Sequence, residues 1–94
     1  MKKPFKIAIQ MDPWSVINVS TDSTYLIALE AQKRGYELFS YQPNNLTLNL
    51  GVVKATGNFV SLNSARKNFY SLKKTQTINL DNFDVVLVRQ DPPF

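Results

Sequence analysis

The sequence contains neither cysteine nor histidine among its 94 residues. The lack of cysteine excludes disulfides, cysteine nucleophiles and thiolate metal sites, and it is compatible with a reducing compartment such as the cytoplasm. The lack of histidine removes the commonest general base near neutral pH and the commonest metal ligand. Any catalysis by this chain alone would therefore depend on carboxylates, lysine or tyrosine.

Glycine and long apolar runs are also scarce. The three glycines, Gly35, Gly51 and Gly57, lie outside any GxGxxG or GxxxxGK[ST] motif, so we expect caps or turns and no phosphate-binding loop. No segment approaches the roughly 20 apolar residues of a membrane span. Lys6 and Gln10 interrupt the apolar start of the chain, which is too short for a signal peptide. We therefore expect a cytoplasmic protein without a membrane partner.

What is present is the composition of an ordinary folded domain. The hydrophobic fraction is 44%, which argues against disorder, and 94 residues make one domain or one part of a larger protein. The formal charge is +4, which is compatible with an anionic ligand. The basic residues are scattered and form no stripe interleaved with aromatics, so we do not expect a nucleic-acid partner.

The first half of the chain predicts a strand–helix–strand unit. Residues 5–11 form a short apolar run of the kind found in strands buried on both faces. Residues 22–34 are rich in helix formers, with Asp22 placed to cap the start and Gly35 placed to end the helix. Residues 36–42 alternate as a strand does. Such crossovers are nearly always right-handed, so the two strands should be parallel.

The middle of the chain predicts antiparallel pairing. We expect Pro43 to end the second strand, because proline cannot donate to a ladder. Residues 46–62 then alternate around a glycine and indicate a β-hairpin, with a bulge at Gly57. Residues 69–72 could add a strand, whereas residues 65–72 could instead form a helical turn. The sequence leaves these two alternatives open.

The last third ends in a second apolar strand. Residues 75–82 read as a polar connection. Residues 84–89 contain a β-branched, fully apolar run that is typical of a central strand. The fold class is therefore α/β, with the three parallel strands 5–11, 36–42 and 84–89, the helix 22–34 and an inserted antiparallel hairpin around 46–62.

Polar residues follow two of the predicted parallel strands. Asp12 ends the first strand and Asp91 follows the last, and ligands of open α/β sheets bind beyond such carboxyl ends. Aspartate is also common in turns, because its carboxylate can bond nearby backbone N–H groups. These two positions alone therefore do not distinguish a ligand site from an ordinary turn. Arg89 ends an apolar strand and must find a polar or charged partner, because burying an unpaired charge is costly. It either pairs with Asp12 or Asp91 as a structural bridge or holds an anionic ligand through its guanidinium fork.

Three segments together resemble bacterial glutathione synthetase: MDPW..IN at 11–18, DST.....LEAQKRGYEL at 22–38 and DVVLVRQDPPF at 84–94. The resemblance implies that residues 1–94 are the N-terminal, pre-ATP-grasp domain of that enzyme, a small three-layer Rossmann-like domain. The family joins γ-glutamylcysteine to glycine to give glutathione, ADP and phosphate. It uses ATP and magnesium through later ATP-grasp parts that this chain lacks.

The resemblance also implies roles for particular residues. Asp12, Asn18, Arg89 and Asp91 match strand-end motifs and would help form the γ-glutamylcysteine or glutathione site. No catalytic, cofactor-binding or metal-binding residue would lie in this chain, which alone should be inactive. Family members are typically homotetramers. The alternative is a stand-alone α/β binding or assembly module without catalysis.

Overall fold

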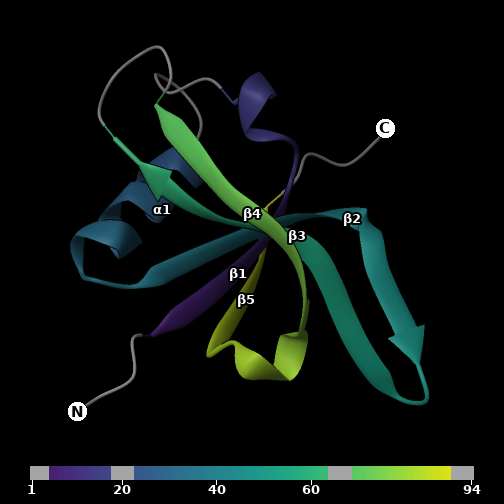
Figure 1. Cartoon of the computed structure of the whole chain (residues 1–94). Helices are drawn as coiled ribbons and strands as arrows, with labels where there is room; N and C mark the ends of the chain where they lie inside the picture. Colours follow the sequence, from purple (N-terminus) through teal and green to yellow (C-terminus); the bar gives the residue numbers. More distant parts are fainter. Residues whose placement is uncertain (1–4, 18–22, 64–68, 90–94) are drawn as a thin grey trace.

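The computed structural model describes residues 5–17, 23–63 and 69–89. These residues form a mixed five-stranded sheet with one α-helix packed on one face, as Figure 1 shows. The predicted α/β class and its parallel strands are confirmed. The three-layer domain implied by the resemblance has helices on both faces of the sheet, whereas the α-helix of the described ranges covers one face. No helix in these ranges is long and apolar enough to cross a membrane.

The strand β1 (Lys6–Met11) is the centre of the parallel part of the sheet. It lies between β2 (Glu37–Asn49) and β5 (Val85–Arg89) and runs parallel to both. Its apolar run is buried on both faces, as the sequence predicts, because both faces are covered. One face packs against the helix through Ile7, Ile9 and Met11, and the other face contributes Ala8 to a separate cluster.

The helix α1 (Ser23–Lys33) ends in the glycine cap that the sequence predicts. Gly35 has φ +85°, a conformation that glycine adopts without the steric cost of a Cβ atom. Its amide donates to the carbonyl of Gln32 at 2.9 Å, and the next amide donates to the carbonyl of Ala31 at 3.1 Å. This is the hydrogen-bond pattern of a Schellman motif. The predicted cap at the start, Asp22, lies outside the described residues.

Side-chain hydrogen bonds attach α1 to the end of strand β3 (Val52–Leu62). The side-chain amide of Gln32 donates to the carbonyl of Leu62 and accepts from its amide, both at 2.6 Å. The hydroxyl of Tyr25 donates to the carbonyl of Asn63 at 2.8 Å. The helix therefore spans the sheet from β1 to β3.

Strand β2 continues beyond the point where we expected it to stop. Its pairing with β3 shifts register between Tyr41 and Leu46, and Pro43 lies in the segment between them. A bulge lets a strand continue past a residue that cannot donate to the ladder. The prediction that Pro43 ends the strand was wrong for that reason. The predicted hairpin is formed by the far half of β2 and by β3, and it projects from the molecule in Figure 1.

The turn of this hairpin has an unusual residue. Leu50 has φ +53° and Gly51 has φ +81°, so both central residues are left-handed, as in a type I′ turn. Asn-Gly is the pair that favours this geometry, whereas leucine carries a steric cost there. Leu50 is also 96% exposed. In the described chain, Leu50 therefore has an unfavourable backbone conformation and no apolar contact that would compensate for it.

We expect Leu50→Asn to stabilise the chain by about 0.5–1 kcal/mol, because asparagine tolerates the left-handed conformation better than leucine. Urea unfolding followed by circular dichroism measures the change. Leu48→Asn is the matched control, because Leu48 is 73% exposed and lies in the extended part of the hairpin. Equal effects of the two substitutions would show that the turn conformation is not the cause.

The edge strand β4 (Tyr70–Asn79) was only partly anticipated. The strand alternative for residues 69–72 is confirmed from Tyr70 on, and residues 64–68 lie outside the described ranges. The predicted polar connection 75–82 was wrong over residues 75–79, which continue the strand. Residues 71–77 are exposed, so an apolar alternation is not required of them. That is why the periodicity did not reveal this strand.

The last strand, β5, has the predicted direction but a different place in the sheet. It pairs with β1 alone and lies at the edge of the described sheet. The prediction of a central, buried strand was therefore wrong for the described residues. Val86 is 40% exposed and Val88 is 64% exposed. The sequence of β5 is that of a strand covered on both faces, whereas the described chain covers it incompletely.

Candidate functional site

The carboxyl ends of β1 and β5 lie side by side. Met11 is the register partner of Arg89, so Asp12 follows immediately beyond the pair. The Arg89 side chain extends toward the start of α1, where its Nη2 donates to the hydroxyl of Ser23. The parallel register thus places Arg89 beside the end of β1, and its side chain reaches Ser23, which is 66 residues away in the sequence.

Within the described ranges, no carboxylate lies within 4.0 Å of the Arg89 guanidinium. The structural ion pair with Asp12 that the sequence left open is therefore not formed. The other predicted partner, Asp91, and the predicted site residue Asn18 lie outside the described residues. Arg89 is exposed, and its side chain donates to a neutral hydroxyl, that of Ser23. An exposed guanidinium of this kind can bind a carboxylate ligand by donating two parallel hydrogen bonds to it.

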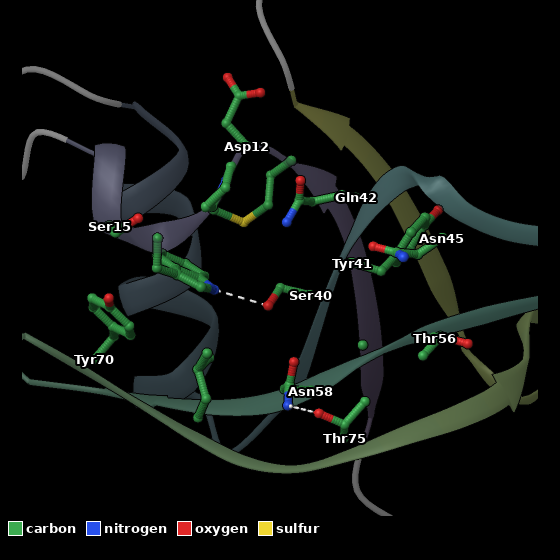
Figure 2. A pocket seen from close by; sticks show the side chains of 15 residues that line it. Asp12, Ser15, Ser40, Tyr41, Gln42, Asn45, Thr56, Asn58, Tyr70 and Thr75 are labelled. Atoms are coloured by element: carbon green, nitrogen blue, oxygen red, sulfur yellow. Dashed lines mark hydrogen bonds between the residues drawn. The ribbon is translucent and has the colours of Figure 1, made fainter.

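A polar cleft adjoins this edge on the helix side of the sheet. It has a volume of about 260 Å³ and lies between the loop after β1 and the strands β2, β3 and β4, as Figure 2 shows. Its lining consists mainly of hydroxyl and amide side chains with an aromatic wall. These side chains include Ser15, Ser40, Gln42, Asn45, Thr56, Asn58, Thr75, Trp14 and Tyr70.

Trp14 closes one side of the cleft. The indole Nε1 donates to the hydroxyl of Ser40 at 2.8 Å, and the ring stacks on Tyr70 with centroids 6.3 Å apart. Only 3% of Trp14 is exposed, so the ring covers one end of the core. The bond to Ser40 matters because a buried indole N–H without a partner would be costly. This wall is therefore held in one orientation.

Among the described residues, Asp12 is the only charged one that lines the cleft. It is half-buried, and in Figure 2 its carboxylate points away from Ser40 toward the outer rim. On the floor, the Asn58 side-chain amide donates to the carbonyl of Lys73 at 2.8 Å and to the hydroxyl of Thr75 at 3.0 Å. Burial raises the pKa of Tyr41, so its phenol is neutral at physiological pH. The cleft is thus polar and nearly uncharged, with one carboxylate at its rim.

Sequence reasoning singled out Asp12, which lies at the rim of the cleft, and missed the residues of the floor. Asp12 and Arg89 were predicted as site residues from their places at strand ends, and Arg89 does not line the cleft. Ser40 was missed, although it is a single hydroxyl in an otherwise apolar strand segment and 8% exposed. A lone polar residue at a buried strand position is a signal that an internal hydrogen bond is required. Thr75 gave no such signal because its strand is largely exposed, and Asn58 gave none because it is only half-buried in β3.

Comparison with known proteins agrees with this architecture. Residues 5–94 match the family described as "Prokaryotic glutathione synthetase, N-terminal domain". The chain belongs to this family. The resemblance carried by the strand-end motifs is thereby confirmed, and the match includes the cleft and the edge with Arg89.

Proteins named glutathione synthetase are similar to this family member along its whole length. The one from Agrobacterium fabrum is 44% identical over 94 residues, which is 100% of this chain and 30% of the relative. Those from Brucella melitensis and Vibrio cholerae are each 43% identical over 89 residues, which is 95% of this chain and 28% of the relative. The chain therefore spans less than a third of the length of these relatives.

Proposed function

We propose that this chain is the substrate-binding N-terminal part of an ATP-dependent ligase that joins γ-glutamylcysteine and glycine to give glutathione, ADP and phosphate. The observation that carries the proposal is the family match over residues 5–94. The strand-end geometry supports it, because Arg89 is an exposed cation beside the polar cleft. In the proposal this region forms part of the wall of the γ-glutamylcysteine or glutathione site and packs against an ATP-grasp part.

The chemistry of the dipeptide suits the groups at this edge. γ-Glutamylcysteine carries two carboxylates and one ammonium group. In the proposal the Arg89 guanidinium binds one carboxylate, with Ser23 holding the guanidinium at the start of α1. Asp12 attracts the ammonium group from the rim of the cleft. Asn18 and Asp91 lie outside the described residues; the proposal assigns them to the same site because they follow β1 and β5 in the sequence.

The described residues form no phosphate-binding loop and no acidic cluster of the kind that binds ATP or magnesium. Each glycine has another place: Gly35 caps α1, Gly51 lies in the hairpin turn and Gly57 lies where two backbones meet. The described ranges contain no group of three His, Cys, Asp or Glu side chains that could hold a cation. In the proposal, ATP and magnesium are therefore bound by the ATP-grasp part of a longer protein, and none is bound by this chain alone.

The remaining parts of the proposal concern location and assembly. We place the enzyme in the cytoplasm, since the sequence contains no cysteine and γ-glutamylcysteine needs its thiol reduced. We also propose a homo-oligomer, a tetramer as in the resembling family. Size-exclusion chromatography with light scattering on the longer protein measures this directly.

The test uses a fused protein, in which this chain replaces the matched segment of the Agrobacterium fabrum relative. With γ-glutamylcysteine, glycine, ATP and magnesium, we expect glutathione from the fused protein and none from the 94-residue chain alone. The relative itself is the positive control. A folded fused protein that makes no glutathione would contradict the proposed site and favour a binding or assembly role. Glutathione formation by the chain alone would contradict the proposed division of labour.

A further inference from the structure

A buried hydrogen bond lies behind the segment that carries Asp12. The indole Nε1 of Trp14 donates to the hydroxyl of Ser40 at 2.8 Å, along the dashed line that reaches Ser40 in Figure 2. Both residues are buried. Ser40 belongs to the buried part of β2, where its neighbours Phe39 and Tyr41 are aromatic. A hydroxyl at such a position contributes little to apolar packing, so the hydrogen bond that it accepts is the reason for its presence.

The backbone between Trp14 and Asp12 is short and has little freedom. Pro13 lies between the two residues, and its ring fixes its φ, which is −55°. The amide of Val16 donates to the carbonyl of Pro13 at 3.0 Å, and this bond closes the 3-10 turn η1 (Trp14–Val16). A movement of the Trp14 ring is therefore passed on to the Asp12 backbone two residues away.

Aromatic contacts hold the Trp14 ring from the side. Its centroid lies 6.4 Å from that of Phe69 and 6.3 Å from that of Tyr70. Phe69 in turn lies edge-on to Tyr25 of α1, with centroids 5.3 Å apart. Contacts of this kind allow several ring orientations, whereas a hydrogen bond is directional. The bond to Ser40 therefore decides where the indole N–H points.

Loss of the Ser40 hydroxyl would make the ring turn. The N–H would then have no partner in β2, and a buried donor without a partner is costly. Ser40 lines the polar cleft, so water in the cleft is the nearest substitute acceptor. The indole can reach that water only by leaving its present orientation, and η1 would move with it.

We propose that Ser40 is a positioning residue for the dipeptide site. Through Trp14 it holds the Asp12 carboxylate at the rim of the cleft, where the carboxylate meets the ammonium group of γ-glutamylcysteine. This role rests on the proposed function. The position of Asp12 matters because no other described residue that lines the cleft is charged. The attraction between two charges falls with their separation, so no second carboxylate of the described lining compensates when Asp12 moves.

The first test is Ser40→Ala in the fused protein. We expect the KM for γ-glutamylcysteine to rise about fivefold and the KM for ATP to stay within about twofold, because about fivefold corresponds to one hydrogen bond of ordinary strength. Ser40→Thr keeps the hydroxyl and should restore the KM. Ser71→Ala is the matched control, because Ser71 is an exposed serine of β4 outside the cleft lining. It should change neither constant.

Trp14→Phe separates positioning from stability. Phenylalanine keeps an aromatic ring and removes the donor, so no N–H is left without a partner. We expect the same rise in KM, with a smaller fall in melting temperature than for Ser40→Ala. The double variant should show about the fivefold effect of one substitution, since the two residues act through one bond. The product of the two single effects would overturn the proposal, and if Ser40→Ala does not fold, Trp14→Phe carries the test.

The 94-residue chain permits a direct observation of the ring, because Trp14 is its single tryptophan. In Ser40→Ala the fluorescence emission should move to longer wavelength and acrylamide should quench it more strongly, since the indole turns toward water. Ser40→Thr and Ser71→Ala should match the unsubstituted chain, and circular dichroism identifies folded variants. Unchanged emission and quenching in folded Ser40→Ala would overturn the proposal.

Failure of this role is distinguishable from failure of the proposed function. Glutathione formation by the unsubstituted fused protein tests the function. An active fused protein whose KM for γ-glutamylcysteine is unchanged in Ser40→Ala and Trp14→Phe would overturn the positioning role alone, even if both variants melt at lower temperature. A folded but inactive fused protein would reject the function and, with it, the role of Asp12 toward the dipeptide.

Discussion

Arg89→Ala in the fused protein is expected to raise the KM for γ-glutamylcysteine about 30-fold and to leave the KM for ATP within about twofold. The reason is the loss of a charge-assisted contact to a carboxylate, which is worth about 2 kcal/mol. Arg89 has no carboxylate partner within 4.0 Å among the described residues, so its removal breaks no ion pair there. Steady-state kinetics with each substrate varied in turn measures both constants.

The control for this experiment is Arg34→Ala. Arg34 is also an exposed arginine, but it pairs with Glu30 at 3.1 Å at the other end of α1. We expect no change in either KM. Arg89→Lys tests the fork geometry, because lysine keeps the charge and loses bidentate binding. An equal rise in both KM values together with a lower melting temperature for Arg89→Ala would show a structural role instead.

Gly57→Ala is expected to destabilise the chain by about 3 kcal/mol or more, at the upper end of the cost of overpacking. A Cβ atom at this position would lie 2.1 Å from the carbonyl oxygen of Ser40 and 2.9 Å from the Cβ of Tyr41. The oxygen belongs to the backbone of β2, so no side-chain rotation can relieve the contact. β2 and β3 would have to move apart beside the cleft.

Thermal unfolding measures this effect, with an expected fall in Tm of about 12 °C or more for a domain of this size. Gly51→Ala is the matched control, because Gly51 has φ +81° and a Cβ there would meet nothing within 4 Å. It isolates the cost of a left-handed alanine, about 1–2 kcal/mol. If Gly57→Ala costs no more than Gly51→Ala, the close approach of the two strands is not a real constraint.

Local signals in the sequence were sufficient where one segment determines its own structure. The apolar run of β1 and the helix formers of α1 predicted both elements, and Gly35 marked the end of the helix. The expected bulge was placed at Gly57. The β2–β3 register instead shifts between Tyr41 and Leu46, whereas the β3–β4 register shifts close to Gly57, between Asn58 and Val60. Glycine is required at position 57 because the backbone of β2 approaches it closely.

Local sequence signals failed where a neighbouring strand decides whether a segment is paired. Pro43 stops a ladder only if its partner strand requires a hydrogen bond there, and the shifted pairing with β3 removes that requirement. Residues 75–79 form a strand because β3 pairs with them, although Ile78 alone among them packs against an apolar cluster. Ser40 lines the cleft because β2 passes beside the segment after β1, where the Trp14 indole donates to it.

The sequence by itself determined the α/β class, the parallel strand–helix–strand unit, the family and the polar ends of β1 and β5. These depend on local periodicity, on caps and on motifs that a single segment carries. Only the tertiary structure decided that Arg89 meets Ser23, that a polar cleft forms beside Asp12, and that β5 has an open edge with Val86 and Val88 exposed. These depend on register and crossover handedness, which are properties of pairs of segments far apart in the chain.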